Sequence, residues 1–259
     1  MKRIFFLFLF VNLSNLLFSQ IDSLNQQQTD SIPLTEKEIL AANKAFVSNI
    51  IKDYTNAIGG EKKIKKFKNV VIKTNIIIEN VTYNIVKYYE YPDKMTKIMS
   101  SMGSRIEKVI YDGNKGRRWG VQGYKIYEKE ELDELQYEAT IFLPLFFDKY
   151  KFALTYDTTE YIDGNEAHRI SAITKNEKLH QFHFSALTGH LIRWTLPFQN
   201  DEAEEELLTI DYSDFKMVDE YEFPHEMIYT RGDLKMKFKV TLITINEKLE
   251  NDIFMLIDK

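Results

Sequence analysis

The chain has 259 residues, of which 44% are hydrophobic and 28% are charged, and its formal net charge is -5 at pH 7. This length and apolar content suffice for an ordinary hydrophobic core. The sequence contains no cysteine, which excludes disulfides, thiolate metal sites, a catalytic cysteine and a lipid-modified N-terminal cysteine. Basic residues are scattered rather than gathered on one stripe, so no nucleic acid is expected as a partner.

The first twenty residues have the features of a secretory signal peptide. Lys2 and Arg3 precede an apolar run, and a small residue, Ser19, stands near the expected cleavage point. The apolar run, residues 4–18, is interrupted by polar residues and is shorter than the roughly 20 residues that span a bilayer. We therefore predict a cleaved signal peptide over residues 1–20, with a retained signal anchor as the alternative.

A polar leader follows the predicted signal peptide. Residues 21–34 are rich in Gln, Ser, Asn and Asp and cannot bury enough apolar surface to become ordered. We expect this leader to be disordered. The mature protein is expected to be periplasmic or otherwise exported, and soluble after cleavage.

The first strong structural signal is an amphipathic helix. Thr35 followed three residues later by Glu38 fits a capping box. Apolar residues then recur at helical spacing, and the pair Gly59-Gly60 supplies a left-handed stop. The sequence thus predicts a helix over residues 35–58, and a short basic turn over residues 61–67 that leads into a sheet.

From residue 69 onward the apolar residues alternate with a period near two, and turn signals separate the alternating segments. This pattern is typical of an antiparallel meander. The predicted strands are 69–78, 83–91, 94–101, 104–111, 115–121, 152–157, 167–174, 179–184, 190–196, 207–215, 224–230 and 234–246. The dipeptides Asp112-Gly113 and Asp163-Gly164 are predicted to be hairpin turns whose glycines have positive φ.

A helical segment interrupts the meander near the middle of the chain. Residues 129–140 carry leucines and an alanine on one stripe amid Glu and Asp, which predicts a shorter second helix. The very apolar segment 141–147 follows at once. This segment either lies at the mouth of a hollow or completes the core.

Several short motifs follow one another in a fixed order between residues 40 and 256. They are Ala57-Ile58-Gly59-Gly60-Glu61, Tyr111-Asp112-Gly113 before Trp119, Ile162-Asp163-Gly164 before His168, Leu187-Thr188-Gly189, Asp211-Tyr212, Phe223-Pro224, and Ile245-Asn246 before Phe254. Their order resembles that of the outer-membrane lipoprotein-sorting proteins with the LolA/LolB-like fold. This resemblance implies a mainly β fold with α, in which residues 35–259 form one domain. Its strongly curved antiparallel sheet, an incomplete barrel, would wrap around the N-terminal and middle helices, and its apolar hollow would accept acyl chains.

The residue pattern also points to an apolar hollow. A curved sheet whose concave side is filled only by helices leaves a cavity wherever that filling is small, and such cavities commonly bind apolar ligands. Methionines two steps apart on one strand would provide an adaptable lining. The residues expected to border the cavity are Ile72, Ile76, Met95, Met99, Leu135, Phe142 and Phe146. The alternative is that these side chains complete a packed core.

No pattern in the sequence singles out a catalytic centre. His180 and His183 are three residues apart in a predicted strand, which places them on opposite faces, so they cannot share a metal ion. The sequence has neither a GxSxG nucleophile elbow nor a glycine-rich phosphate loop. We therefore expect a protein without enzymatic activity, bound metal or cofactor.

Two functions remain from different classes. The first is a monomeric envelope carrier or chaperone that shelters a lipid, or the acyl chains of a lipoprotein, in the hollow. The second is a non-catalytic structural or interaction module of the envelope with the same fold and a packed interior. A hydrolase whose acid and base are hidden among the many carboxylates is the residual alternative.

Overall fold

The structure is a computed structural model that describes residues 35–121, 123–199 and 205–258. The predicted signal peptide and the predicted leader lie outside the described residues. The helices are α1 (Glu36–Ala57), α2 (Glu61–Ile64), α3 (Lys129–Ala139) and the 3-10 helix η1 (Leu143–Phe146). The strands before α3 are β1 (Asn69–Ile78), β2 (Val81–Glu90), β3 (Lys94–Ser101), β4 (Ser104–Tyr111), β5 (Gly116–Gly120) and β6 (Gly123–Tyr127). The strands after η1 are β7 (Ala153–Ile162), β8 (Asn165–Ile173), β9 (Leu179–Ser185), β10 (Leu191–Gln199), β11 (Glu205–Val218), β12 (Tyr221–Arg231) and β13 (Leu234–Ile245).

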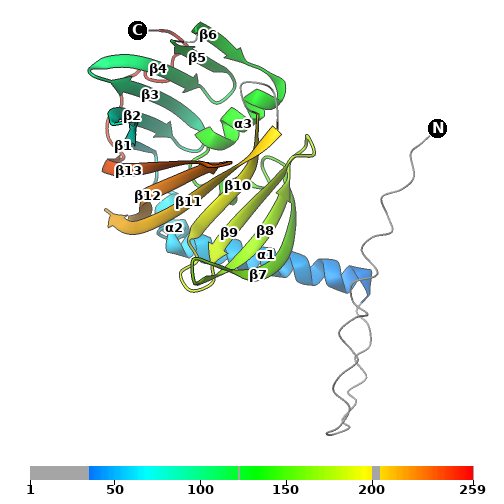
Figure 1. Cartoon of the computed structure of the whole chain (residues 1–259). Coiled ribbons are helices and arrows are strands. Elements are labelled where there is room, and N and C mark those ends of the chain that lie inside the picture. Colours follow the sequence, from blue (N-terminus) through cyan, green and yellow to red (C-terminus); the bar gives the residue numbers. More distant parts are fainter. Residues whose placement is uncertain (1–34, 122, 200–204, 259) are drawn as a thin grey trace, which may run out of the picture.

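All of these strands belong to one sheet with the order β6-β5-β4-β3-β2-β1-β13-β12-β11-β10-β9-β8-β7. Strands that follow one another pair antiparallel within each half, and the pairing of β1 with β13 joins the two halves. The edges β6 and β7 do not pair with each other within the described chain, so the sheet stays open. The sheet bends strongly, and α3 lies on its inner side (Figure 1). The predicted incomplete barrel of antiparallel strands around an N-terminal and a middle helix is confirmed.

Helix α1 begins and ends as the sequence predicts. The backbone N–H of Thr35 donates to Oε2 of Glu38 at 2.8 Å, and the backbone N–H of Glu38 donates to the Thr35 hydroxyl at 3.3 Å, which completes the capping box. Gly59 and Gly60 both have positive φ after the last turn. The expectation of a simple turn over residues 61–67 is wrong, because residues 61–64 close one further helical turn, α2.

Most strand ends lie within three residues of the predicted ones, and the larger differences concern β6 and β7. Strand β6 was not predicted, because its five residues follow β5 after a very short connection and carry no long alternating pattern. Strands β7 and β8 reach the turn between them, whereas the predicted strands stop short of it. The register of β7 shifts between Tyr156 and Thr158, and this bulge interrupts the alternation that the prediction relies on.

The two predicted hairpin turns are confirmed. Ile162 pairs directly with Asn165, so Asp163 and Gly164 form a two-residue loop. Both have positive φ, 48° and 81°, which is the conformation of a type I′ turn. Gly113 likewise has φ of 95° in the connection between β4 and β5.

Replacing Gly164 with valine is expected to destabilise the protein by about 1 kcal/mol, because a β-branched residue is poorly tolerated at positive φ. A Cβ at this position would meet no other atom within 4 Å, so the loss of stability would come from the backbone conformation and not from a steric clash. Denaturant unfolding measures it. The control Gly164→Asn, whose side chain tolerates this conformation, should lose clearly less, and equal stability of all three proteins would contradict the assigned turn.

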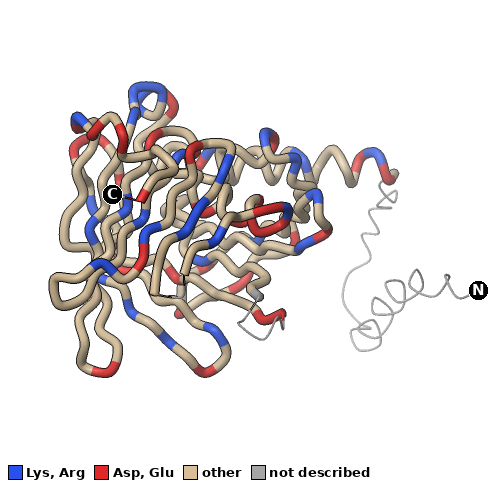
Figure 2. Tube along the Cα trace, turned by 90° about the horizontal axis from the view of Figure 1, so that it is seen from above, with Lys and Arg blue, Asp and Glu red and all other residues tan. Residues whose placement is uncertain are grey.

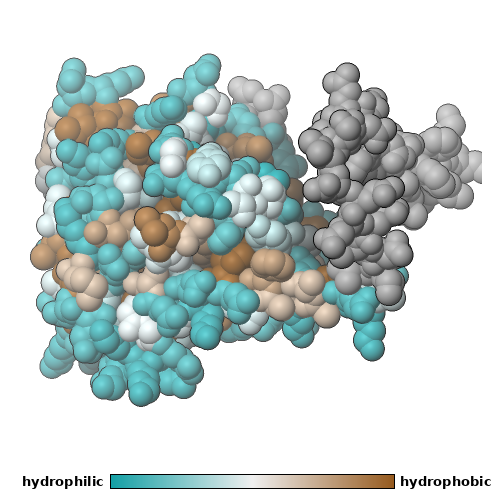
Figure 3. Space-filling model, turned by 90° about the horizontal axis from the view of Figure 1, so that it is seen from below, coloured by the Kyte–Doolittle hydropathy of each residue, from teal (hydrophilic) through white to brown (hydrophobic). Residues whose placement is uncertain are grey.

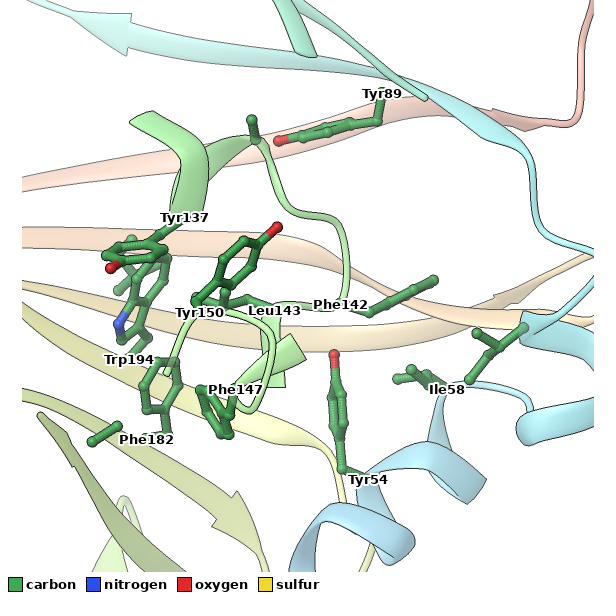
Figure 4. Packing of buried hydrophobic residues seen from close by; sticks show 14 of the residues in the cluster. Tyr54, Ile58, Tyr89, Tyr137, Phe142, Leu143, Phe147, Tyr150, Phe182 and Trp194 are labelled. Atoms are coloured by element: carbon green, nitrogen blue, oxygen red, sulfur yellow. The ribbon is translucent and has the colours of Figure 1, made fainter. Parts of the chain in front are cut away.

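The core extends over both halves of the sheet and contains an aromatic cluster on the inner side of β7–β11. Phe182 is fully buried and contacts Phe147 with ring centroids 4.8 Å apart, while on its other side Trp194 stacks at 5.5 Å. Tyr54 of α1 meets Phe184 at 5.6 Å. Figure 4 shows how side chains from α1, α3, the segment after α3 and the strands converge on this cluster. Close packing of this kind leaves little empty space in that half of the molecule.

The C-terminal segment covers part of the outer face of the sheet. The hydroxyl of Thr96 donates to the carbonyl of Ile253 at 2.6 Å, and Nζ of Lys108 donates to the carbonyl of Ile257 at 3.2 Å. Thr96 and Lys108 both point to the side of β3 and β4 opposite α3. The segment therefore leaves the inner face of these strands uncovered.

Candidate ligand site on the concave face

Strand register places most of the predicted cavity residues on one face. Met95 and Met99 of β3 stand opposite Tyr89 and Ile85 of β2, and the same register continues onto β1 at alternate positions that include Ile72 and Ile76. Lys87, which lies on this face between Ile85 and Tyr89, contacts Glu138 of α3. The face is therefore the concave one, on which α3 lies.

The seven predicted residues differ in how much surface they leave for a ligand. Ile76, Met95, Leu135 and Phe142 are buried among protein side chains, whereas Ile72, Met99 and Phe146 are half-buried. Leu135 of α3 packs directly against Gly116 of β5. Ile72, Met99 and Phe146 therefore keep some exposed surface, whereas the other four would become accessible only after neighbouring groups have moved.

The apolar segment 141–147 contributes to both the core and its edge. Phe142, at φ 59°, packs against Phe67 at 5.2 Å and Phe223 at 5.8 Å between ring centroids. Phe146 lies farther out, with its ring 5.6 Å from that of Tyr91. The segment thus completes the core through Phe142, while Phe146 packs at the edge of the core and keeps part of its surface exposed.

A row of charged residues crosses the same concave face, and the sequence reasoning missed it. Across five strands the row runs from Arg118 of β5 through Val109, Lys97 and Lys87 to Ile72 of β1. Its signal was present in the sequence, because Lys87 and Lys97 each stand in the middle of an alternating apolar stripe. Glu138, which faces both lysines, is distant from them in sequence, so only the fold brings these groups together.

Two carboxylates face this charged row. Glu138 accepts a hydrogen bond from Nζ of Lys87 at 2.9 Å, and its Oε1 lies 3.8 Å from Nζ of Lys97. Glu107 lies 3.6 Å from Lys97 and 4.0 Å from Nη1 of Arg118. We call Lys87, Lys97, Glu107, Arg118 and Glu138 the concave charge cluster.

Pairing keeps Glu138, Lys87 and Lys97 ionised. Burial by itself disfavours the charge of Glu138, but Lys87 and Lys97 outweigh burial and lower the pKa of this carboxyl to about 2. Burial also disfavours the charge of Lys87, yet Glu138 raises the pKa of this amine well above its usual value. The same balance, set by burial and Glu138, raises the pKa of Lys97. At neutral pH these three groups are charged.

Three tyrosines lie close to the concave charge cluster. The phenols of Tyr89, Tyr212 and Tyr229 are close enough to Lys87 to interact with it electrostatically, and burial raises the pKa of Tyr89 and Tyr212. Further half-buried apolar residues that pack against the core are Leu196, Leu208, Tyr229 and Val240. The concave face therefore presents apolar area next to fixed charges, which suits an amphiphilic ligand.

Two surface cavities lie elsewhere. One, of about 430 Å³, lies between the C-terminal segment and the ends of β2 and β3, with Lys94 and Phe254 among its lining residues. The other, of about 470 Å³, lies over β9, β10 and β11 and includes Gln181 and Leu207. None of the seven predicted cavity residues lines either of them.

The rest of the molecule carries charge of both signs. Positions with Lys or Arg and positions with Asp or Glu are scattered over all of the described part of the chain (Figure 2). The face seen in Figure 3 likewise mixes hydrophobic with hydrophilic residues. The concave charge cluster differs from these surfaces because its cations are half-buried against an apolar wall.

The histidines are arranged as their spacing predicts. His180 is fully buried and accepts a hydrogen bond from Nε1 of Trp194 at 3.3 Å, whereas His183 points to the opposite face and hydrogen-bonds to Glu160. Within residues 35–121, 123–199 and 205–258, no three His, Asp or Glu side chains are grouped so that they could hold a metal ion.

None of the helices in this described part has the length and apolar character needed to cross a bilayer.

Comparison with known proteins finds similarity in structure. No protein-family model and no curated protein matches the chain. A DUF1329 family protein from Desulfovibrio piger and a LolA superfamily protein from Nitrosomonas europaea each superpose on the chain with a TM-score of 0.55 and 8% sequence identity, and each match covers 81% of this chain and 97% of the other. A putative outer membrane lipoprotein-sorting protein domain from Vibrio parahaemolyticus superposes with a TM-score of 0.53 and 10% identity, and the match covers 80% of this chain and 95% of the other. At such low identity the likeness concerns the fold. The chain thus has the fold of the LolA superfamily and of outer membrane lipoprotein-sorting domains, as its motif order implies.

Proposed function

We propose that this protein is a non-catalytic carrier or chaperone of the cell envelope, which binds a lipid or the acyl chains of a lipoprotein on the concave face. The observation that carries the proposal is the half-buried apolar area of Ile72, Met99 and Phe146 on the inner side of an open half-barrel. We further propose that residues 35–259 act as one monomeric domain, exported by the signal peptide at residues 1–20.

The energy available from such a site is sufficient for binding. Each buried methylene contributes roughly 0.8 kcal/mol, so a chain segment of about eight methylenes would gain roughly 6 kcal/mol before the costs of association. The half-buried residues can provide part of this area directly. The remainder would come from Ile76, Met95, Leu135 and Phe142 if α3 and the segment after it shift outward on binding.

A second function is favoured by the same four buried residues. In the described structure their side chains are already buried among other protein groups, as expected for a packed module of the envelope that binds protein partners and no lipid. The two proposals differ in one respect, which is whether the concave face takes up an acyl chain.

Binding of a fluorescent fatty acid tests the carrier proposal. We expect the protein to bind the probe, and Met99→Glu to weaken binding at least fivefold, because a carboxylate on the concave face places charge against the chain. Met99 is half-buried, so the variant should still fold, which circular dichroism verifies. Tyr161→Glu, at an aromatic residue of β7 that is 75% exposed, is the matched control and should bind as the parent does. Absence of probe binding by the unmodified protein would favour the packed module.

A further inference from the structure

We propose that the ligand is an anionic amphiphile and that Lys97 and Arg118 receive its carboxylate or phosphate group. This inference rests on the proposed function, because it concerns the polar end of the molecule whose chain would contact the concave face. It is carried by the composition and geometry of the concave charge cluster.

The cluster has one more positive than negative charge. Lys87, Lys97 and Arg118 are cations, and Glu107 and Glu138 are the carboxylates that face them. Lys125 and Glu131, which lie next to this row, form their own ion pair at 2.6 Å and leave the balance unchanged. A half-buried excess charge is costly unless an anion compensates for it.

The positions of the unsatisfied groups show where that anion would bind. Lys87 has a short hydrogen bond to Glu138, at 2.9 Å. In contrast, Lys97 reaches Glu107 and Glu138 at 3.6 and 3.8 Å, which is longer than an ordinary N–H···O hydrogen bond. Nε of Arg118 is buried and has no hydrogen-bond partner among the described residues. Lys97 and Arg118 therefore keep donor capacity that an oxyanion could use.

Arg118 and Lys97 are also well placed relative to each other. Lys97 of β3 and Arg118 of β5 both pair with Val109 of β4, which lies between them. Two strand spacings therefore separate their Cα atoms, which is about 10 Å. Their long side chains extend on the same face and can converge on one group. A guanidinium and an ammonium in this arrangement match a carboxylate or a phosphate, for which arginine offers two parallel N–H donors.

The apolar wall begins next to these cations. Met99 follows Lys97 by two residues on the same face of β3, and its row continues across the sheet through Ile85 and Thr74 to Val240. Three strand spacings separate β3 from β13 along this row, which is about 14 Å. An acyl chain lying along the row would have its charged end at Lys97 and Arg118.

The test compares three probes of different charge and chain content. Dodecanoate carries both anion and chain, its methyl ester carries the chain alone, and inorganic phosphate carries the anion alone. We expect the protein to bind dodecanoate at least tenfold more tightly than the ester, and phosphate far more weakly than either. Equal affinity for dodecanoate and ester would overturn this inference and leave the carrier function standing. Failure to bind both would remove the carrier function as well, and phosphate binding as tight as dodecanoate would show an anion site without a chain site.

Variants of Arg118 assign the effect to the cluster. In Arg118→Gln the preference for dodecanoate over its ester should fall to about twofold while ester binding is retained, and Arg118→Lys should restore part of the preference. Arg117→Gln is the matched control, because Arg117 points to the opposite face of β5, where it donates to the carbonyl of Leu256. An unchanged preference in folded Arg118→Gln would contradict the assignment.

Discussion

Phe182→Ala is expected to destabilise the protein by about 4 kcal/mol, the typical cost of truncating a fully buried phenylalanine. Phe182 has no exposed surface and lies between the rings of Phe147 and Trp194, so its removal leaves a cavity that the two neighbouring rings cannot fill. Denaturant unfolding monitored by tryptophan fluorescence measures the loss, and Trp194 reports directly on the site.

The control for this prediction is Tyr161→Ala, which truncates an exposed aromatic residue on the neighbouring part of the sheet. Its effect should stay within about 0.5 kcal/mol. A loss below about 1.5 kcal/mol in Phe182→Ala would mean that the aromatic cluster is not close-packed. In that case the inner side of the β7–β11 half would itself be a candidate cavity.

Glu138→Gln is expected to cost about 2 kcal/mol at pH 7, because it leaves Lys87 and Lys97 without their shared carboxylate. Breaking a fully buried pair costs roughly 3–5 kcal/mol. The Glu138 side chain is 38% exposed, so water screens its charge and reduces the cost. Glu131→Gln, whose ion pair with Lys125 is more exposed, is the control and should lose no more than about 1 kcal/mol.

The loss in Glu138→Gln should depend on pH in a defined direction. The pKa of Glu138 is lowered from 4.5 to about 2 by its two lysines, although burial opposes this change. A carboxyl whose pKa is lower in the folded than in the unfolded protein stabilises the fold. This stabilisation is fully present above the pKa of the unfolded state and is lost as the pH falls toward the pKa of the folded state. The difference between parent and variant should therefore be constant above about pH 5 and nearly vanish by about pH 2. A difference that stays constant over this whole range would contradict the pairing.

Features fixed by local chemistry were predictable from the sequence. Thr35 and Glu38 form their capping box from four consecutive residues, and the Asp163-Gly164 turn follows from the needs of a two-residue hairpin loop. The alternation in β1 identified Ile72 and Ile76 as members of one face. In each case the determining interactions lie within a few residues of one another.

Features that depend on distant contacts were not predictable in the same way. Lys97 and Arg118 lie on predicted strands, but their pairing with Glu107 and Glu138 requires the sheet register and the position of α3. The burial of Phe142 depends likewise on Phe67 and Phe223, which lie far from it in sequence. A lysine at the centre of an apolar stripe is the one local signal that pointed to the charged row.

The central claim is that an acyl chain binds on the concave face, and the most direct measurement is native mass spectrometry of protein purified from its producing cells without denaturant. We predict that an acyl-chain lipid, with an anionic group, remains bound and is released on unfolding. Protein that carries no lipid, and that takes up none when fatty acid is added, would contradict the account and leave a packed half-barrel that acts through protein partners.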